Sequence, residues 1–179
     1  MPTYISLLRG INVGGNKKIK MADLRALYAD LGYGDVKSVL QSGNVVFDAH
    51  GDDPAAIRRA IEGAIQDAFG FEAGVLVLTV PRFRDAVNAH PFTEAHLAQP
   101  SFVRVVFLDE LPTPDKVEAL MAAIPGDEQV WHVGRALYVF YPSGGGKSKL
   151  DLNRMERALG VTGTARNWNT VQKLLGLVE

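Results

Sequence analysis

The sequence contains no cysteine, and this absence excludes several functional classes at once. A disulfide framework, a thiol nucleophile and a cysteine-ligated metal all need a side chain that the chain lacks. Long hydrophobic runs are also missing, because the longest ones, near residues 75–80 and 103–108, have the length of a strand. Residues 4–8 are too short for the apolar core of a signal peptide. We therefore expect a cytoplasmic protein that does not enter a membrane.

The composition is that of an ordinary globular protein, with 47% hydrophobic and 22% charged residues among 179. That length suits either one compact body or two small subdomains. The net charge of −1 hides an uneven distribution. Residues 1–22 carry four basic side chains and no acidic one, residues 142–179 carry six basic and three acidic, and the rest carry nine basic and 17 acidic. Either helix faces are simply solvated, or both ends contribute to one positive patch that faces an anionic partner.

Hydrophobic periodicity and turn residues divide the chain into two series of elements. The first series comprises a strand at 3–9, a helix around 24–31, strands at 36–40 and 45–47, a helix that begins at Asp53-Pro54 with Ile57, Ile61 and Ile65 in its buried stripe, and a strand at 75–80. A connecting helix is predicted at 81–89. The second series comprises a strand at 102–108, a helix from Thr113-Pro114, strands at 129–133 and 136–141, a helix after Ser148, a strand at 163–168 and a last helix.

Both series have the order β-α-β-β-α-β, which is the split βαβ pattern of ferredoxin-like folds. We therefore predict the α+β class, with two ferredoxin-like (βαββαβ) subdomains in tandem, each an antiparallel sheet with its helices on one face. The first subdomain is expected at residues 1–80 and includes a glycine-rich loop. A connecting helix and loop follow at 81–100, and the second subdomain with the C-terminal helix is expected at 101–179.

The most unusual stretch is the segment 9–18, directly after the first predicted strand. It holds three positive charges, three glycines and two asparagines: Arg9, Lys17, Lys18, Gly10, Gly14, Gly15, Asn12 and Asn16. A glycine-rich backbone that leads into a helix can direct several N–H groups at a phosphate or carboxylate. The glycine spacing is not the dinucleotide-binding fingerprint. The alternative is a wide turn whose glycines supply positive φ angles.

A second glycine-rich segment, at 143–148, lies between a predicted strand and a predicted helix. Tyr141 occupies the position of the leading glycine of a P-loop, and the antiparallel pattern is not that of a P-loop protein. We interpret the segment as a flexible loop with two lysines, which could close over a ligand. Ser148 is predicted to cap the following helix, with Asp151 three residues later.

Two further polar segments are candidates for a site. The turn at 41–44 contains Ser42 and Asn44, which could form hydrogen bonds to a ligand as well as shape the turn. Arg166, Asn167 and Trp168 precede the last helix, whose N-cap we predict at the neighbouring Asn169 or Thr170. A tryptophan beside an arginine could stack on a base or a sugar, or it could be half-buried in the core.

Metal binding and catalysis find little support in the sequence. His50, His90, His96 and His132 do not have the spacing of metal ligands, and we predict no metal and no cofactor. Ser42, His90 and Tyr141 are the candidate reacting groups of an enzyme, but nothing in the sequence pairs any of them with an activating partner.

Three blocks together resemble the signature of one bacterial family, the domain-of-unknown-function 1697 family. They are Leu8-Arg9-Gly10-Ile11-Asn12-Val13-Gly14-Gly15, Gln41-Ser42-Gly43-Asn44-Val45-Val46-Phe47 and Arg166-Asn167-Trp168-Asn169-Thr170-Val171-Gln172-Lys173-Leu174. Where that family usually has Asn-Pro-Phe, this chain has His90-Pro91-Phe92. The resemblance implies a small cytosolic bacterial protein with paired ferredoxin-like subdomains, and it implies no activity.

We expect a binding protein for a small anionic or phosphate-bearing ligand such as a nucleotide. The predicted site residues, from the glycine-rich loop, the 41–44 turn and the segment before the last helix, are Arg9, Gly10, Asn12, Gly14, Gly15, Ser42, Asn44, Arg166, Asn167 and Trp168. Single-stranded nucleic-acid binding is an alternative, although the net charge of −1 does not favour it. An enzyme of unknown reaction and a purely structural scaffold are further alternatives, and the oligomeric state is left open.

Overall fold

The computed structural model describes all residues from 1 to 179, and the chain forms two compact units. The first unit comprises Met1–Arg84 and Lys173–Glu179, and the second comprises Asp85–Gln172. The divisions fall inside two helices, α3 (Val80–Asn88) and α7 (Trp168–Val178). The sequence-based subdomain boundaries at residues 80 and 100 stay predictions. Each unit is described by itself below.

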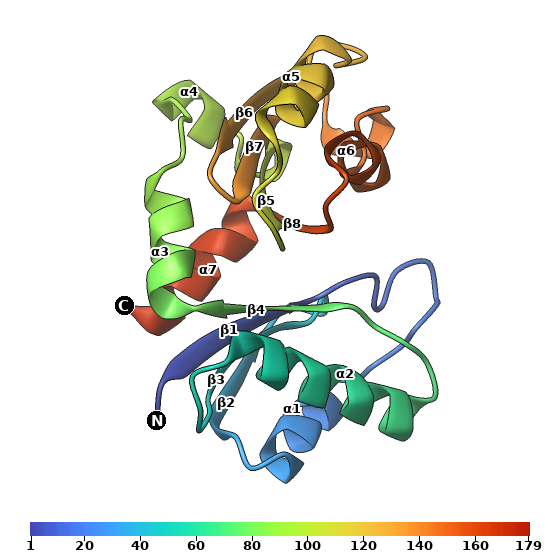
Figure 1. The fold of residues 1–179 in the computed structure, drawn as a ribbon, viewed down its shortest axis with the longest axis vertical. Helices are drawn as coiled ribbons and strands as arrows, with labels where there is room; N and C mark the ends of the chain where they lie inside the picture. The colour runs from blue at the N-terminus through green and yellow to red at the C-terminus, as the bar shows by residue number, and fades with distance from the viewer. The chain divides into compact units, whose positions relative to one another are not determined.

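The first unit is an antiparallel sheet of four strands with two helices on one face, as Figure 1 shows. Its elements in chain order are β1 (Thr3–Leu8), α1 (Met21–Asp30), β2 (Gly34–Val39), β3 (Asn44–Asp48), α2 (Pro54–Phe69) and β4 (Val75–Thr79). The strands lie in the order β2-β3-β1-β4, so β1 is central and pairs with both β3 and β4.

Local sequence signals explain α2 well. The Asp53 carboxylate accepts a hydrogen bond of 3.0 Å from the backbone N–H of Ala55, and Pro54 occupies the first helical position, as predicted. Ile57, Ile61 and Ile65 are buried against the sheet, also as predicted. Their spacing of four residues keeps them on one face of the helix.

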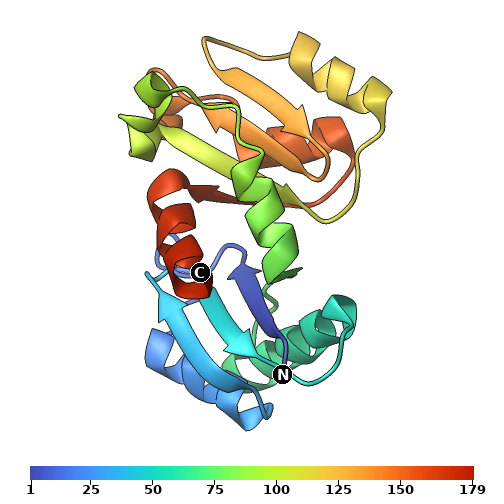
Figure 2. The same ribbon diagram turned by 90° about the vertical axis from the view of Figure 1, so that its left-hand side faces the viewer.

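The second unit repeats the architecture. Its elements are the second half of α3, α4 (Glu94–Leu97), the 3₁₀ turn η1 (Pro100–Phe102), β5 (Val103–Leu108), α5 (Pro114–Ala122), β6 (Gln129–Val133), β7 (Ala136–Phe140), the 3₁₀ turn η2 (Gly145–Lys147), α6 (Leu152–Leu159), β8 (Gly163–Asn167) and the start of α7. The strand order is β6-β7-β5-β8, and Figure 2 shows these strands side by side. The predicted α+β class with two ferredoxin-like subdomains in tandem is therefore confirmed.

The helix α6 begins three residues later than predicted. Asp151, not Ser148, is its N-cap, and the carboxylate of Asp151 accepts a hydrogen bond of 2.8 Å from the N–H of Arg154. Ser148 does not cap the helix because its hydroxyl donates to the Glu128 carboxylate and accepts from the N–H of Leu150 at 3.0 Å. In both units the helices that cover the sheet bury an apolar core, and no helix of the chain is long and apolar enough to cross a membrane.

Candidate functional site

The glycine-rich loop of the first unit ends in a tight exposed turn. Gly14 and Gly15 both have positive φ angles, of 59° and 78°, and the N–H of Asn16 donates to the carbonyl of Val13 at 3.0 Å. This is the geometry of a two-residue hairpin turn, which favours glycine at both central positions. Ile11 and Ile19, which are 2% and 3% exposed, anchor the two sides of the loop in the core.

Asn12 holds this loop in shape. Its side-chain Oδ1 accepts from the N–H of Ile19 at 2.9 Å, and its Nδ2 donates to the carbonyl of Ile19 at 2.9 Å. The same Nδ2 donates to the carbonyl of Gln41 at 2.7 Å. The side-chain amide therefore replaces missing backbone pairs, and it joins the loop to the turn at 41–44.

The turn at 41–44 is also tied to the end of β1. Asn44 is fully buried, and its Nδ2 donates to the carbonyl of Val39 at 2.9 Å and to Oγ of Ser42 at 2.8 Å. Gly43 has a φ of 83°, and its carbonyl accepts from the N–H of Leu8 at 2.9 Å. A Cβ placed on Gly43 would lie 2.6 Å from Cβ of Leu8, so only glycine allows this approach.

Arg9 and Gly10 lie at the start of the loop. The backbone N–H of Arg9 donates to the carbonyl of Gly74 at 2.9 Å, and the half-buried Arg9 side chain packs against Gly74. Gly10 is exposed and has a φ of 67°. Arg9 thus connects the end of β1 to the residue before β4.

An open pocket of about 660 Å³ lies where the loop meets α1. It is lined by Asn12, Gly15, Lys18, Ile19, Lys20, Asp23, Gln41 and Phe69. Asn12 and Gly15 are the two residues of the predicted site that contribute to the lining. Lys18, Lys20 and Gln41 were not in the predicted set, although the two lysines lie three and five residues after Gly15 and could have been included on their charge alone. Phe69, at the end of α2, had no signal in the sequence.

Lys20 is the N-cap residue of α1, and its side chain makes no capping hydrogen bond. The first N–H groups of a helix have no partner within the helix, and a lysine cannot accept a hydrogen bond from them. The N-terminal end of α1 therefore keeps its partial positive charge beside two lysines.

In the second unit, Arg166 lies on β8 and is half-buried. Its Nη1 donates to the carbonyl of Ala165 at 3.0 Å. Burial lowers the pKa of the Arg166 guanidinium to about 10, because the surrounding protein solvates the charged form poorly.

The next two residues shape the start of α7. Oδ1 of Asn167 accepts from the N–H of Thr170 at 3.0 Å and from its hydroxyl at 3.1 Å. Asn167 is thus the N-cap, and the predicted caps at Asn169 or Thr170 are wrong because the helix already begins at Trp168. The Trp168 side chain is only 8% exposed. Its ring meets His90 edge-on at 4.9 Å between centroids.

Trp168 belongs to an aromatic cluster within the second unit. Phe92 is at its centre and contacts the rings of Trp168, Trp131 and Tyr138, at 5.8, 5.7 and 5.9 Å between centroids. Burial raises the pKa of Tyr138 to about 12. Trp131 and Tyr138 are partners on β6 and β7, and Tyr138 alternates with Leu137 and Val139, which pack in the core with α5 and α6. The cluster therefore lies on the opposite face of the sheet. These contacts give Trp168 a place in the core.

The three candidate reacting groups are each engaged in local structure. Ser42 Oγ accepts from Asn44, Nδ1 of His90 accepts from the N–H of Phe92 at 3.2 Å, and the Tyr141 hydroxyl donates to the carbonyl of Leu150 at 2.8 Å. Burial also raises the pKa of Tyr141. The chain has no group of three or more His, Asp or Glu side chains that could hold a metal ion.

Comparison with known proteins gives a family and a fold. The family model described as "Protein of unknown function (DUF1697)" matches residues 1–138, which leaves the segment 166–174 outside the match. No curated protein matches the chain. Among solved structures, the conserved bacterial protein SP0830 from Streptococcus pneumoniae is similar in fold. The TM-score is 0.75, the sequence identity is 24%, and 99% of each chain is covered. The chain belongs to the DUF1697 family of proteins of unknown function.

Proposed function

We propose that this protein binds a small anionic or phosphate-bearing ligand in the pocket between the glycine-rich loop and α1. One observation carries the proposal: α1 begins without a side-chain cap inside a pocket that two lysines line. Uncapped N–H groups, a helix dipole and two ammonium groups together favour a negative charge at this position.

The charge balance of the pocket supports the same ligand class. Lys18 and Lys20 contribute two positive charges, and Asp23 in the first turn of α1 contributes one negative charge. Lys17 donates to the carbonyl of Glu72 at 2.7 Å instead, so it holds the loop. An anion of one or two charges would therefore find a net positive surface.

The proposal gives the predicted site residues unequal roles. Gly15 lines the pocket and offers its backbone, while Asn12 fixes the loop through hydrogen bonds that a ligand does not have to replace. Lys18 and Lys20 take the role of charge partner that the sequence suggested for Arg9. The buried amide of Asn44 acts indirectly, because it shapes the turn that Asn12 contacts.

The test is a binding measurement on the full chain with inorganic phosphate, pyrophosphate and a series of nucleotides. We expect at least one of them to raise the unfolding temperature and to bind about 10-fold more weakly to the K18A/K20A double variant, which corresponds to about 1.4 kcal/mol. Lys37→Ala is the matched control, since Lys37 is an exposed lysine of the same unit that does not line this pocket. Lack of stabilisation by all of these anions would remove the proposal, as would equal losses in the double variant and the control.

The alternatives have weaker support. Single-stranded nucleic-acid binding would use Trp168 as a stacking platform, but 8% exposure leaves little of its ring for a base. An enzyme would need an activated nucleophile or base, and Ser42, His90 and Tyr141 each form a local structural hydrogen bond. For the cellular location we propose the cytoplasm, in line with the absence of cysteine.

A further inference from the structure

The second unit has its own glycine-rich loop, residues 142–149, between β7 and α6. A serine at each end of its glycine segment is bound to an acidic residue just before β6. The Ser143 hydroxyl donates to Oδ2 of Asp127 at 3.0 Å, and the Ser148 hydroxyl donates to Oε1 of Glu128. The loop is therefore fastened at two points, and the three glycines between them are held only by short-range backbone contacts.

Arg104 explains why the middle of this loop is glycine. Its guanidinium lies over the ring of Tyr141, 5.3 Å from the centroid, and it also packs against Gly145. A Cβ on Gly145 would lie 2.8 Å from Nη2 of Arg104. No carboxylate forms an ion pair with Arg104 in the structure.

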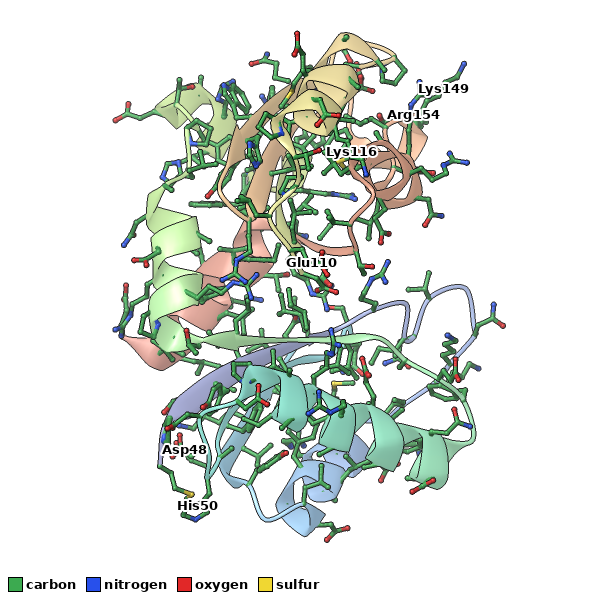
Figure 3. The ribbon with its side chains drawn as sticks, in the orientation of Figure 1. Asp48, His50, Glu110, Lys116, Lys149 and Arg154 are labelled. Atoms are coloured by element: carbon green, nitrogen blue, oxygen red, sulfur yellow. The ribbon has the colours of Figure 1, made fainter.

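A pocket of about 220 Å³ opens between the loop and the acidic pair. It is lined by Pro125, Gly126, Asp127, Glu128, Tyr141, Ser143, Gly144, Lys147, Ser148 and Lys149. Lys147 and Lys149 are exposed and form no ion pair. Figure 3 shows Lys149 and Arg154 close to the end of α6 that follows the loop.

The pocket offers a ligand both hydrogen-bond donors, from its two lysines, and an acceptor, from Glu128. Oε2 of Glu128 is buried and has no hydrogen-bond partner, whereas its Oε1 is bound to Ser148. A buried carboxylate oxygen of this kind gains from a cationic donor. The charges that line the pocket cancel, because two carboxylates face two ammonium groups. A phosphate dianion would meet both carboxylates, whereas a molecule with one positive and one negative group would match both signs.

We propose that this pocket binds a small zwitterion of the amino-acid class. Its ammonium group donates to Oε2 of Glu128, and its carboxylate accepts from the two lysines that line the pocket, Lys147 and Lys149. The pocket is already open in the structure, and the two serine hydrogen bonds hold the loop in place beside it. The site lies wholly in the second unit and does not depend on the anion site proposed for the first unit.

The test is a titration of the ¹⁵N-labelled full chain with each of the proteinogenic amino acids, followed by NMR. We expect at least one of them to shift the amide resonances of Gly144, Gly145 and Gly146 saturably, with no change at the amides of Lys18 and Lys20. The N-acetyl and carboxamide derivatives of that amino acid, which each lack one charge, are expected to bind at least 10-fold more weakly. Absence of shifts with every amino acid would overturn the proposal, and so would equal binding of the N-acetyl derivative, which would indicate an anion site.

A pair of variants localises the interaction. Glu128→Gln keeps an oxygen that can accept from Ser148 but removes the negative charge, and we expect it to weaken binding at least 10-fold. Lys116→Ala is the control, because Lys116 is an exposed lysine of α5 that does not line the pocket (Figure 3). Unchanged affinity in Glu128→Gln, with the rest of its spectrum preserved, would contradict the assignment, as would equal weakening in the control.

Discussion

The two units share a strand order but elaborate different loops. In the first unit the long glycine-rich connection follows the first strand, between Leu8 and α1, and the connection after the third strand is short. In the second unit the connection after β5 is short, and the glycine-rich one follows β7. The two sheets have the same topology, but the long polar loop follows the first strand in one unit and the third strand in the other.

The way in which each loop is held also differs. Asn12 fastens the first loop to backbone carbonyls and an N–H of its own unit, and the buried Asn44 supports the turn that it contacts. The second loop is fastened by serine hydroxyls to Asp127 and Glu128, one of them at an exposed position. Most of the amide hydrogen bonds that hold the first loop and its turn are partly buried, and such bonds cost more to break than exposed ones. The first loop is therefore expected to be preformed, and the second to open more readily.

Equivalent central-strand residues show the same contrast. Tyr4 is the second residue of β1, and Arg104 is the second residue of β5. Each reaches the loop before a helix, which is α2 in the first unit and α6 in the second. The Tyr4 hydroxyl donates to the carbonyl of Gly51 at 2.7 Å. Arg104 contacts Gly145 with a charged group instead. The same strand position thus forms a neutral hydrogen bond in the first unit and a cationic contact in the second.

The difference in rigidity between the two loops can be tested by substitution, and we expect the largest loss of stability at Gly43. Gly43→Ala would place a methyl group 2.6 Å from Cβ of Leu8, at a backbone position with a φ of 83°. Strain and overpacking each cost about 1–3 kcal/mol, so we expect the free energy of unfolding to fall by about 3 kcal/mol. Denaturant titration of the variant measures this loss.

Gly14→Ala is the control for that experiment. Gly14 also has a positive φ, of 59°, but nothing lies within 4 Å of the position that an added Cβ would take. We expect a loss of about 1 kcal/mol from backbone strain alone. Equal losses at the two positions would mean that the turn at 41–44 can move away from β1, and the first loop would then not be rigid.

The contact between Gly43 and Leu8 also illustrates which features of the fold cannot be predicted from the sequence. The order of elements was accessible because it depends on local signals, such as the cap and proline at Asp53-Pro54 and the isoleucine spacing in α2. The turn itself was predicted, but its contact with Leu8 joins residues 35 positions apart. No local pattern encodes that distance.

The candidate site was harder to predict for the same reason. The sequence predicts that Asn12, Asn44 and Asn167 contribute to a ligand site, and in the structure each of them forms hydrogen bonds within the protein. Trp168 is buried against His90, which lies 78 positions earlier in the chain. Tertiary contacts decide whether a polar or aromatic side chain can reach a ligand, and a single sequence does not contain them.

A smaller loss of stability is expected when the side-chain hydrogen bonds that hold each loop are removed. Asn12→Ala removes three hydrogen bonds to the backbone of Ile19 and Gln41, and it leaves the partly buried N–H and carbonyl of Ile19 without this partner. We expect a loss of about 2 kcal/mol in unfolding free energy. Ser143→Ala removes one hydrogen bond at an exposed position, and we expect about 0.5 kcal/mol. The same denaturant titration compares them.

Asn16→Ala serves as the reference for the asparagine variant, since Asn16 is exposed in the same loop and its replacement should change stability by less than about 0.5 kcal/mol. A loss at Ser143 as large as that at Asn12 would reverse the comparison. It would show that the second loop is the more tightly held of the two.

The smallest of the three main effects concerns Gly145, where the neighbour is the flexible end of a side chain. Gly145 does not have a positive φ, so Gly145→Ala would suffer only from the contact with Arg104. We expect a loss of about 1 kcal/mol, because the guanidinium can shift away at the expense of its position over Tyr141. In a background with Arg104→Ala the same change should cost almost nothing, which gives a coupling energy of about 1 kcal/mol in a double-mutant cycle.

Gly146→Ala is the control, because nothing lies near the position that its Cβ would take. A coupling energy near zero would show that Arg104 does not depend on Gly145 for its position, and the glycines of the second loop would then need another explanation.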